Sequence, residues 1–459
     1  MRITPLSFFF LLFTSISVFA SLEKGAHLTG QIELNLTEGT INSNFEISEY
    51  QTKEKSISFA MNYIIEVNQI SINGTAVKYD KTNEDCADCI IYTIAKESGL
   101  KATDKIKIET SGKFVDRTGI NTNDYKGMIA YNSGIFRAAE QAKWYPVLID
   151  KPIKNSINLR FYYTYKLDID CPECAGVFIG EGLPIAKSGT FSKDEATDAI
   201  LLIAGNIKWE ETEDAIYINV KSEEQIENEK IIKEVKEFYG QLTGNPPNDV
   251  KLVMANLPTD NPTWEGFVTE PVMVNTLKEK RNEFEKEIFL SHEIAHYYFG
   301  KVYKPKSNLY WFFLESGAEY FSYKYLLNKH GKVGSDYHNL KRIRTANYIP
   351  FVKTIQGNDF RFVKLKKIKD PEEISILHRY NIGGFQLLGI EHEIGEEKML
   401  EFIDLLFQQI NEKEHGFTSL QYNLMKLGIT EKEVKRIEKK YFRKIKMRHY
   451  RFLEDLKIN

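Results

Sequence analysis

The residues with the clearest chemical potential are two histidines in the stretch His292-Glu293-Ile294-Ala295-His296. Residues four apart lie on one face of an α-helix, so the two imidazoles can bind one metal ion. Glu293, one step round the helix, can reach a metal-bound water without being a ligand itself. The pattern therefore predicts a zinc site with an adjacent base. A pair of buried or capping histidines is the alternative.

Glu315 is the candidate third ligand. A catalytic zinc usually has three protein ligands and one open position for water or substrate, and Glu315 follows His296 by nineteen positions. Gly300, Pro305 and Asn308 supply the break that a second helix needs to fold back beside the first. The alternative for Glu315 is a solvated carboxylate near the start of that second helix.

These residues could hydrolyse an amide bond. Zinc with an open position lowers the pKa of its bound water towards about 7, which makes hydroxide available at neutral pH. Glu293 would take the proton of that water and deliver it to the leaving amine. Glu319, one helical turn after Glu315, is a candidate to orient one histidine through a hydrogen bond. A plain surface carboxylate is the alternative for Glu319.

The motif resembles the zinc signature of the aminopeptidase N family of gluzincin metallopeptidases, which also includes leukotriene hydrolase. The family pattern continues after the second histidine with Phe-Gly, then Trp, Leu and Glu-Gly. The residues in those places here are Phe299-Gly300 and Trp311…Leu314-Glu315, with Ser316-Gly317 in place of the usual Glu-Gly. The resemblance implies a thermolysin-like domain with one catalytic zinc on His292, His296 and Glu315.

Two further segments extend the resemblance over most of residues 25 to 410. Tyr380–Gly383 is similar to the family's Tyr-x-x-Gly segment, which opens a helix. The resemblance implies that Tyr380 assists the transition state. Trp144–Pro146 resembles a turn of the family's β domain.

One departure concerns substrate binding. Aminopeptidases of this family carry a Gly-x-Met-Glu-Asn strand whose Glu holds the free amino terminus of the substrate. Counting back from His292 places Val268 there, in a segment that begins at Gly266. Glu270 could substitute if the strand shifts by two residues, because alternate side chains share a face. The sequence therefore leaves open whether cleavage is amino-terminal or internal.

The elements that must position these residues fall into two classes. Residues 25–222 are dominated by strand patterns, and the expected strands include Ile57–Val67, Ile106–Thr110, Ile157–Tyr165 and Ala215–Val220. A helix is expected over 223–242, strands over 250–255 and 266–274, and a zinc-binding helix over 278–299 with Gly300 as its cap. After Trp311 nearly everything reads as helical, and the basic tail from Lys432 to Arg451 is expected to dock one apolar face.

These patterns predict an α+β multidomain protein. The expected parts are a signal peptide at 1–20, an antiparallel β domain at 21–222, the thermolysin-like zinc domain at 223–400 and a C-terminal helical segment at 401–459. A chain of 459 residues is long enough for two or three domains.

The four cysteines form two Cys-x-x-Cys pairs, Cys86/Cys89 and Cys171/Cys174. Such pairs could bind a second, structural zinc through four thiolates. In an oxidising compartment they could instead form disulfides, either within each pair or across the two. Export of the chain favours disulfides.

The N-terminus predicts export. Arg2 gives a positive start, Leu6–Phe19 is largely apolar, and cleavage is expected after Ala20. The apolar run is short for a membrane anchor, and no later run is long enough to span a bilayer. The net charge of −3 gives no electrostatic footprint for nucleic acid. The location expected is the periplasm, cell envelope or extracellular space.

The sequence as a whole predicts a secreted zinc metallopeptidase whose partner is a peptide or protein substrate. Another zinc hydrolase on the same scaffold, or a non-catalytic module that holds zinc only structurally, are the alternatives. The presence of both Glu293 and Tyr380 favours catalysis, because a binding module needs neither. The oligomeric state is not determined by these patterns.

Overall fold

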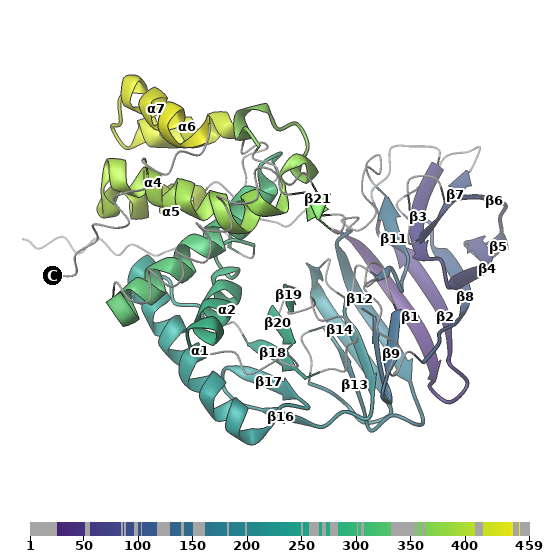
Figure 1. The fold of residues 1–459 in the computed structure, drawn as a ribbon. Helices are drawn as coiled ribbons and strands as arrows, with labels where there is room; N and C mark the ends of the chain where they lie inside the picture. The colour runs from purple at the N-terminus through teal and green to yellow at the C-terminus, as the bar shows by residue number, and fades with distance from the viewer. Residues whose placement is uncertain are drawn as a thin grey trace, which may run out of the picture.

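The computed structural model describes the chain from residue 25 to residue 443, together with residue 449. Within that span the residues outside the description are 51–55, 84–85, 87–88, 96–99, 102, 117–128, 139–141, 150–160, 181–182, 198–199, 249–250, 257–265, 269–271, 276–282, 301, 304–306, 332–353, 356–357, 360–362 and 409–415. The predicted signal peptide and Glu270 therefore lie outside the described residues. Figure 1 shows strands gathered in the N-terminal half and helices in the C-terminal half, which confirms the α+β class.

Seven strands form the largest sheet, in the order β14-β12-β1-β2-β8-β4-β5. Their bounds are β1 Ala26–Asn35, β2 Thr40–Ser48, β4 Ile65–Ile72, β5 Thr75–Ala76, β8 Ile106–Lys113, β12 Tyr163–Asp170 and β14 Ser188–Thr197. Buried and more exposed residues alternate along β1 and β2, as expected when one face of a sheet packs on a core. Neighbouring strands are antiparallel except β1 and β12, which run parallel.

Two four-stranded sheets complete the N-terminal region. One has the order β13-β15-β10-β9 and the other β11-β3-β7-β6. Their bounds are β3 Ser56–Asn62, β6 Tyr79–Thr82, β7 Cys89–Ala95, β9 Ile129–Asn132, β10 Ile135–Ala138, β11 Val147–Ile149, β13 Gly176–Ile179 and β15 Leu202–Gly205. One hydrophobic core joins all three sheets and encloses Trp144, whose Nε1 donates to the carbonyl of Ile200 at 2.8 Å. The predicted antiparallel β region is confirmed, with the β1–β12 pair as its exception.

The single strand expected over Ile57–Val67 is wrong. The chain turns at residues 63–64 and forms the two strands β3 and β4, which belong to different sheets. Tyr63 is exposed at this turn, whereas Phe59 and Val67 are buried on either side of it. The β propensity of the segment is correct, but its apolar residues serve two sheets rather than one.

Disulfides join Cys86 to Cys89 and Cys171 to Cys174. The first pair packs in a small cluster with Ala60 and Ile91, and the second belongs to the large N-terminal core. Because each sulfur is bonded within its own pair, the alternative of a structural zinc on four thiolates is not supported. The disulfide interpretation of these cysteines is the one that fits the structure.

A five-stranded sheet precedes, in the chain, the helix that carries the predicted zinc motif. Its strand order is β16-β17-β18-β20-β19. Its strands are β16 Trp209–Glu211, β17 Ala215–Ile218, β18 Leu252–Ala255, β19 Gly266–Val268 and β20 Val272–Asn275. β17, β18 and β20 run parallel, and the two edge strands are antiparallel to their neighbours. Helix α1, Ser222–Thr243, is the crossover that the parallel pair β17–β18 requires. This sheet thus includes strands from before residue 222.

Helix α2, Glu283–Ala295, follows β20 and carries the predicted metal-binding motif. It ends four residues before the expected end at Phe299. Tyr298 is buried beyond the helix, against Tyr239 and Phe321, and its hydroxyl donates to the carbonyl of Asn245. This tertiary packing outweighs helical continuation, so Gly300 does not cap α2. Its amide instead donates to the carbonyl of Tyr303.

The strand expected over residues 266–274 is two antiparallel strands, β19 and β20. Residues after Trp311 are not all helical either, because β21 Thr354–Ile355 pairs with β22 Asn358–Asp359.

The remaining elements are helical. They are a helix at 310–331 that contains the π-helical segment η3 Phe312–Ser316, the short helices η5 Leu365–Lys367 and η6 Pro371–Glu373, the π-helical segment η7 His378–Ile382, α4 Gly383–Ile394, α5 Glu396–Gln408, α6 Phe417–Lys426, α7 Glu431–Ile437 and the π-helical segment η8 Glu438–Phe442.

The C-terminal helices pack on the helices of the zinc motif. A second large core joins α1, α2 and the 310–331 helix to α4–α7, and includes Val434, Ile437 and Phe442 from the basic tail. The apolar face expected of that tail is therefore docked. Among the described residues, none of the helices has the length and apolar character needed to span a membrane.

Candidate active site

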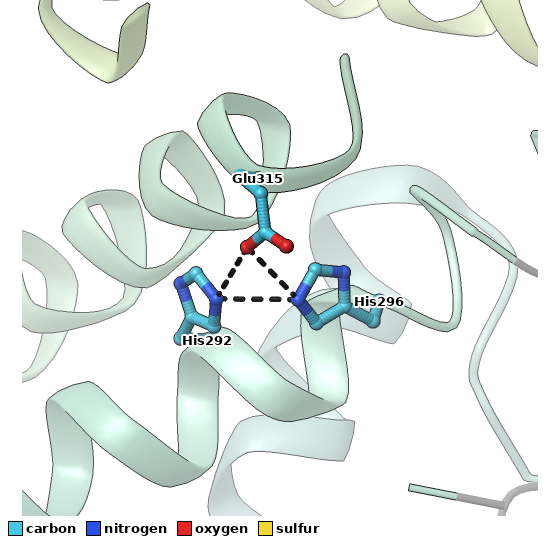
Figure 2. Close-up of side chains that lie close together, drawn as sticks. All are labelled: His292, His296 and Glu315. Carbon is cyan, nitrogen blue, oxygen red and sulfur yellow. Dashed lines mark hydrogen bonds and ion pairs between the residues drawn. The ribbon is translucent and has the colours of Figure 1, made fainter. Parts of the chain in front are cut away.

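His292 and His296 lie on the last turn of α2 and just beyond it, with both rings buried. Figure 2 shows the two rings side by side on this helix, with Glu315 reaching towards both from the helix above. The Nε2 atoms of the two histidines are 3.2 Å apart. The spacing of four residues therefore places both imidazole edges at one point, as the motif predicts.

Glu315 completes a compact group of three donor atoms. Its Oε2 lies 3.3 Å from Nε2 of His292 and 3.6 Å from Nε2 of His296. Ligand atoms about 2.0–2.1 Å from a tetrahedral zinc are separated from each other by about 3.3 Å. The three separations therefore match three corners of a zinc tetrahedron. No other group of three His, Cys, Asp or Glu side chains converges in this way within the described ranges.

Oxygen atoms close to the Nδ1 atoms indicate which ring nitrogens carry protons. Nδ1 of His296 lies 3.2 Å from the carbonyl oxygen of Phe299, and Nδ1 of His292 lies 3.0 Å from Oε1 of Glu319. A carbonyl and a carboxylate can only accept, so each Nδ1 carries the proton and each Nε2 presents a lone pair. Two lone pairs and a carboxylate oxygen that face one another need a cation between them. The residues therefore fit a zinc ion.

Glu315 is ionised in this setting. Burial raises the pKa of the Glu315 carboxyl, but the adjacent imidazoles of His292 and His296 have the larger, opposite effect and hold that pKa well below the usual range. Its negative charge would compensate part of the charge of a divalent ion in a buried position.

Close packing between helices brings Glu315 to the histidines. A Cβ at Gly317 would collide with the ring of Phe299, and a Cβ at Gly383 would collide with Oγ of Ser316. The two glycines therefore let the 310–331 helix approach both the end of α2 and the start of α4. Ser316 is fully buried at this crossing, and its Oγ donates to the carbonyl of Arg379 at 2.9 Å.

Tyr380 lies beside the three donor atoms, on η7. Its ring centroid is 6.2 Å from that of His292. The residue is 37% exposed, but its hydroxyl end is enclosed. Burial, together with the charges of Glu315 and Glu293, raises the pKa of Tyr380 well above its usual value, against a smaller opposing effect of Arg379. The phenol is therefore protonated and can donate.

Glu293 is buried next to His292 on α2, outside the group of three donor atoms. The negative charge of Glu293 helps to raise the pKa of the Tyr380 hydroxyl. This placement suits a group that handles protons near the ion without binding it.

The structure describes two of the three residues considered for substrate binding. Gly266 and Val268 bound the edge strand β19, whose outer side has no neighbour in the described sheet, whereas Glu270 lies outside the described residues.

His378, which is near Tyr380 in the sequence, is fully buried, and its Nε2 contacts Gln386 Oε1 at 2.8 Å. Burial lowers the pKa of His378 to about 4, so it is a neutral core residue.

Sequence reasoning missed three groups around the site. The carbonyl of Phe299 contacts His296, Ser316 links the two helices, and the Arg379 guanidinium stacks on Trp311 at 4.4 Å. The first depends on the end of α2, which the sequence places too late. A serine next to the predicted ligand is the only sequence signal for the second.

Glu319→Gln is expected to weaken zinc binding roughly 10- to 100-fold, the usual cost of losing the partner of a ligating histidine. The amide keeps the shape of the carboxylate but removes the charge that holds His292 Nδ1–H. Competition with a fluorescent chelator measures the change. Glu397→Gln, at an exposed site on α5, is the matched control. Equal zinc affinity in both variants would show that Glu319 does not orient His292.

Comparison with known proteins adds evidence at the level of the fold. No family model matches the sequence, and no curated protein matches it. Among solved structures, native leukotriene A4 hydrolase from yeast is similar with a TM-score of 0.66 and 13% identity, over 92% of this chain and 68% of that one. A variant M1 zinc metallopeptidase from Deinococcus radiodurans bound to a Tyr-Ser-Ala substrate has a TM-score of 0.63 and 13% identity, over 92% and 95% of the two chains. The chain therefore has the fold shared by M1 zinc metallopeptidases and leukotriene A4 hydrolase.

Proposed function

We propose that this chain is a zinc-dependent metallopeptidase that hydrolyses peptide bonds. The observation that carries the proposal is the convergence of two imidazole lone pairs and one carboxylate oxygen, 3.2 to 3.6 Å apart, beside a buried glutamate and a protonated tyrosine. The similarity of fold to M1 zinc metallopeptidases supports the same reading.

Glu293 handles the proton in the proposed reaction. Zinc bound to the three ligands would polarise the scissile carbonyl and lower the pKa of its water to about 7. Glu293 accepts the proton of the attacking water and returns it to the nitrogen of the leaving amine. Glu319 and the Phe299 carbonyl keep both imidazoles turned towards the ion throughout.

Tyr380 stabilises the negative charge that develops on the carbonyl oxygen. Its raised pKa keeps the phenol protonated at neutral pH, so the hydroxyl remains a donor. Ser316 supports this position, because its bond to the Arg379 carbonyl ties the segment of Tyr380 to the helix of Glu315.

Tyr380→Phe is expected to lower kcat roughly 100- to 1,000-fold, the usual effect of removing one oxyanion donor. KM should change little, because the donor acts on charge that forms in the transition state. Steady-state kinetics on a cleaved peptide, with zinc content determined in parallel, make the measurement. A wild-type kcat in a zinc-loaded variant would exclude this role.

The cleavage products show whether the protein removes N-terminal residues or cuts peptides internally. Incubation with a peptide library, followed by mass spectrometry with and without a chelator, identifies each scissile bond. Products shortened by one N-terminal residue would indicate an aminopeptidase, and internal cuts an endopeptidase. Absence of any chelator-sensitive product would contradict the proposed function, and a parallel incubation with a lipid epoxide would test the alternative zinc hydrolase.

We also propose that the chain acts outside the cytoplasm. The apolar N-terminal segment supports export, and two disulfides suit an oxidising compartment. N-terminal sequencing of the protein recovered from the host envelope or medium should read from Ser21.

A further inference from the structure

Tyr380, the proposed oxyanion donor, lies inside a π-helical turn rather than on a regular helix. In η7 the amide of Gly383 donates to the carbonyl of His378, five residues earlier, so the turn holds one residue more than an α-helical turn. The ring centroid of Tyr380 lies 6.2 Å from that of His292. π-Helical turns are rare and occur frequently at functional sites, so the contacts that hold η7 bear on the reaction.

Gln386, on α4, forms a hydrogen bond with the first residue of this turn. Its Oε1 lies 2.8 Å from Nε2 of His378, and its own Nε2 donates to the carbonyl of Tyr441 at 3.1 Å. A carbonyl can only accept, so the amide nitrogen of Gln386 faces Tyr441 and the amide oxygen accepts from Nε2–H of His378. Both side chains are fully buried, and the low pKa of His378, about 4 because of burial, agrees with a neutral ring that donates.

The residue at the other end of this chain of hydrogen bonds is itself closely packed. Tyr441, on η8, is fully buried, and its hydroxyl donates to Oε1 of Glu393 at 3.0 Å. Its ring lies so close to Gly389 that a Cβ there would come within 2.6 Å of it. Gln386 therefore connects η7 to a fixed partner in the C-terminal segment, residues 431–442.

We propose that Gln386 is a positioning residue for Tyr380, which anchors η7 to the C-terminal segment and so keeps the Tyr380 hydroxyl beside the zinc ligands. The inference rests on the proposed peptidase function and extends it to a fully buried residue outside the group of zinc ligands. Ser316 fixes η7 at the carbonyl of Arg379, and Gln386 fixes it at the ring of His378. The turn is thus held at two points, one on each side of the reacting hydroxyl's own helix.

Gln386 could instead stabilise the fold alone. Its loss would then affect hydrolysis with or without the Tyr380 hydroxyl, whereas a positioning residue acts only while that hydroxyl is present. A double-mutant cycle between Gln386→Met and Tyr380→Phe separates the two roles, because residues that act through one another do not contribute additively. Methionine is an unbranched side chain of similar size that forms neither of the two amide hydrogen bonds.

Gln386→Met is expected to lower kcat roughly 10- to 100-fold with little change in KM, the usual effect of misplacing a catalytic group by a fraction of its own size. In the Tyr380→Phe background the same substitution should change kcat by about twofold or less. An equal loss in both backgrounds, or a wild-type kcat in zinc-loaded Gln386→Met, would overturn the proposal. If Gln386→Met does not fold, Gln386→Asn takes its place in the cycle, because it keeps the amide but is one carbon shorter.

Gln421→Met is the matched control. Gln421, on α6, donates to Oε2 of Glu438 at 2.9 Å and so binds the C-terminal segment from α6 rather than from α4. Its replacement should leave kcat at the wild-type value. A loss equal to that of Gln386→Met would show that any loosening of the C-terminal segment slows the reaction, which contradicts a specific role for Gln386.

Amide hydrogen exchange of the zinc-loaded proteins distinguishes failure of this inference from failure of the proposed function. Residues 378–384 should exchange faster in Gln386→Met than in wild type or Gln421→Met, whether or not peptides are cleaved. Faster exchange without peptide cleavage by wild type would uphold the anchoring of η7 and contradict the peptidase. Unchanged exchange, together with additive effects on cleavage, would uphold the peptidase and overturn the role of Gln386.

Discussion

Glu293→Gln is expected to reduce peptide hydrolysis roughly 100- to 10,000-fold while zinc remains bound, because general acid–base catalysis contributes about that much. The glutamine has the same size and keeps the packing of α2, but it cannot accept the proton of the attacking water. Glu293 lies outside the group of His292, His296 and Glu315, so the ligands are unchanged. Single-turnover kinetics and zinc content by mass spectrometry measure the two effects.

The same exchange at Glu285 is the matched control. Glu285 lies on α2 about two turns before His292 and has no proposed role in the reaction. Its glutamine variant should hydrolyse peptides at the wild-type rate. Undiminished hydrolysis in Glu293→Gln would remove the proposed base from the mechanism. Loss of zinc from that variant would mean that Glu293 also supports the ligands.

Glu315→Ala is expected to remove both zinc and activity. The substitution leaves only two imidazoles, and the loss of a direct ligand should exceed the roughly 10- to 100-fold effect of losing an outer partner. Dialysis against a chelator, followed by return of zinc, should restore the wild-type protein but not the variant. Zinc content and hydrolysis are measured at each stage.

Glu397→Ala serves as the control for this experiment, since it removes an exposed carboxylate on α5. Circular dichroism tests whether Glu315→Ala retains its helices, because Glu315 is buried between helices and its loss could disturb their packing. A folded Glu315→Ala protein that binds zinc with wild-type affinity would show that the converging carboxylate is not a ligand.

Much of the site could be predicted from the sequence because its geometry is local. Two histidines four residues apart on α2 must share a face, so their convergence follows from helical periodicity alone. The spacing to Glu315 required more, namely a break between two helices, for which Gly300 and Pro305 are the signals in the sequence. The division into an N-terminal strand-rich part and later helices also followed from periodicity.

Predictions failed where long-range packing decided the local structure. Helix α2 ends at Ala295 rather than Phe299 because Tyr298 is buried among distant aromatic rings. The expected strand over Ile57–Val67 divides between two sheets, and neither sheet can be assigned from a short apolar run.

The sequence alone predicted the candidate ligand types, the candidate base and the class of the fold, because these depend on residue chemistry and on periods of two and 3.6 residues. Only the tertiary structure decided how the segments of Glu315 and Tyr380 are brought together. Their helices meet through Ser316, Gly317 and Gly383, and contacts between residues far apart in the chain leave no periodic trace in a single sequence.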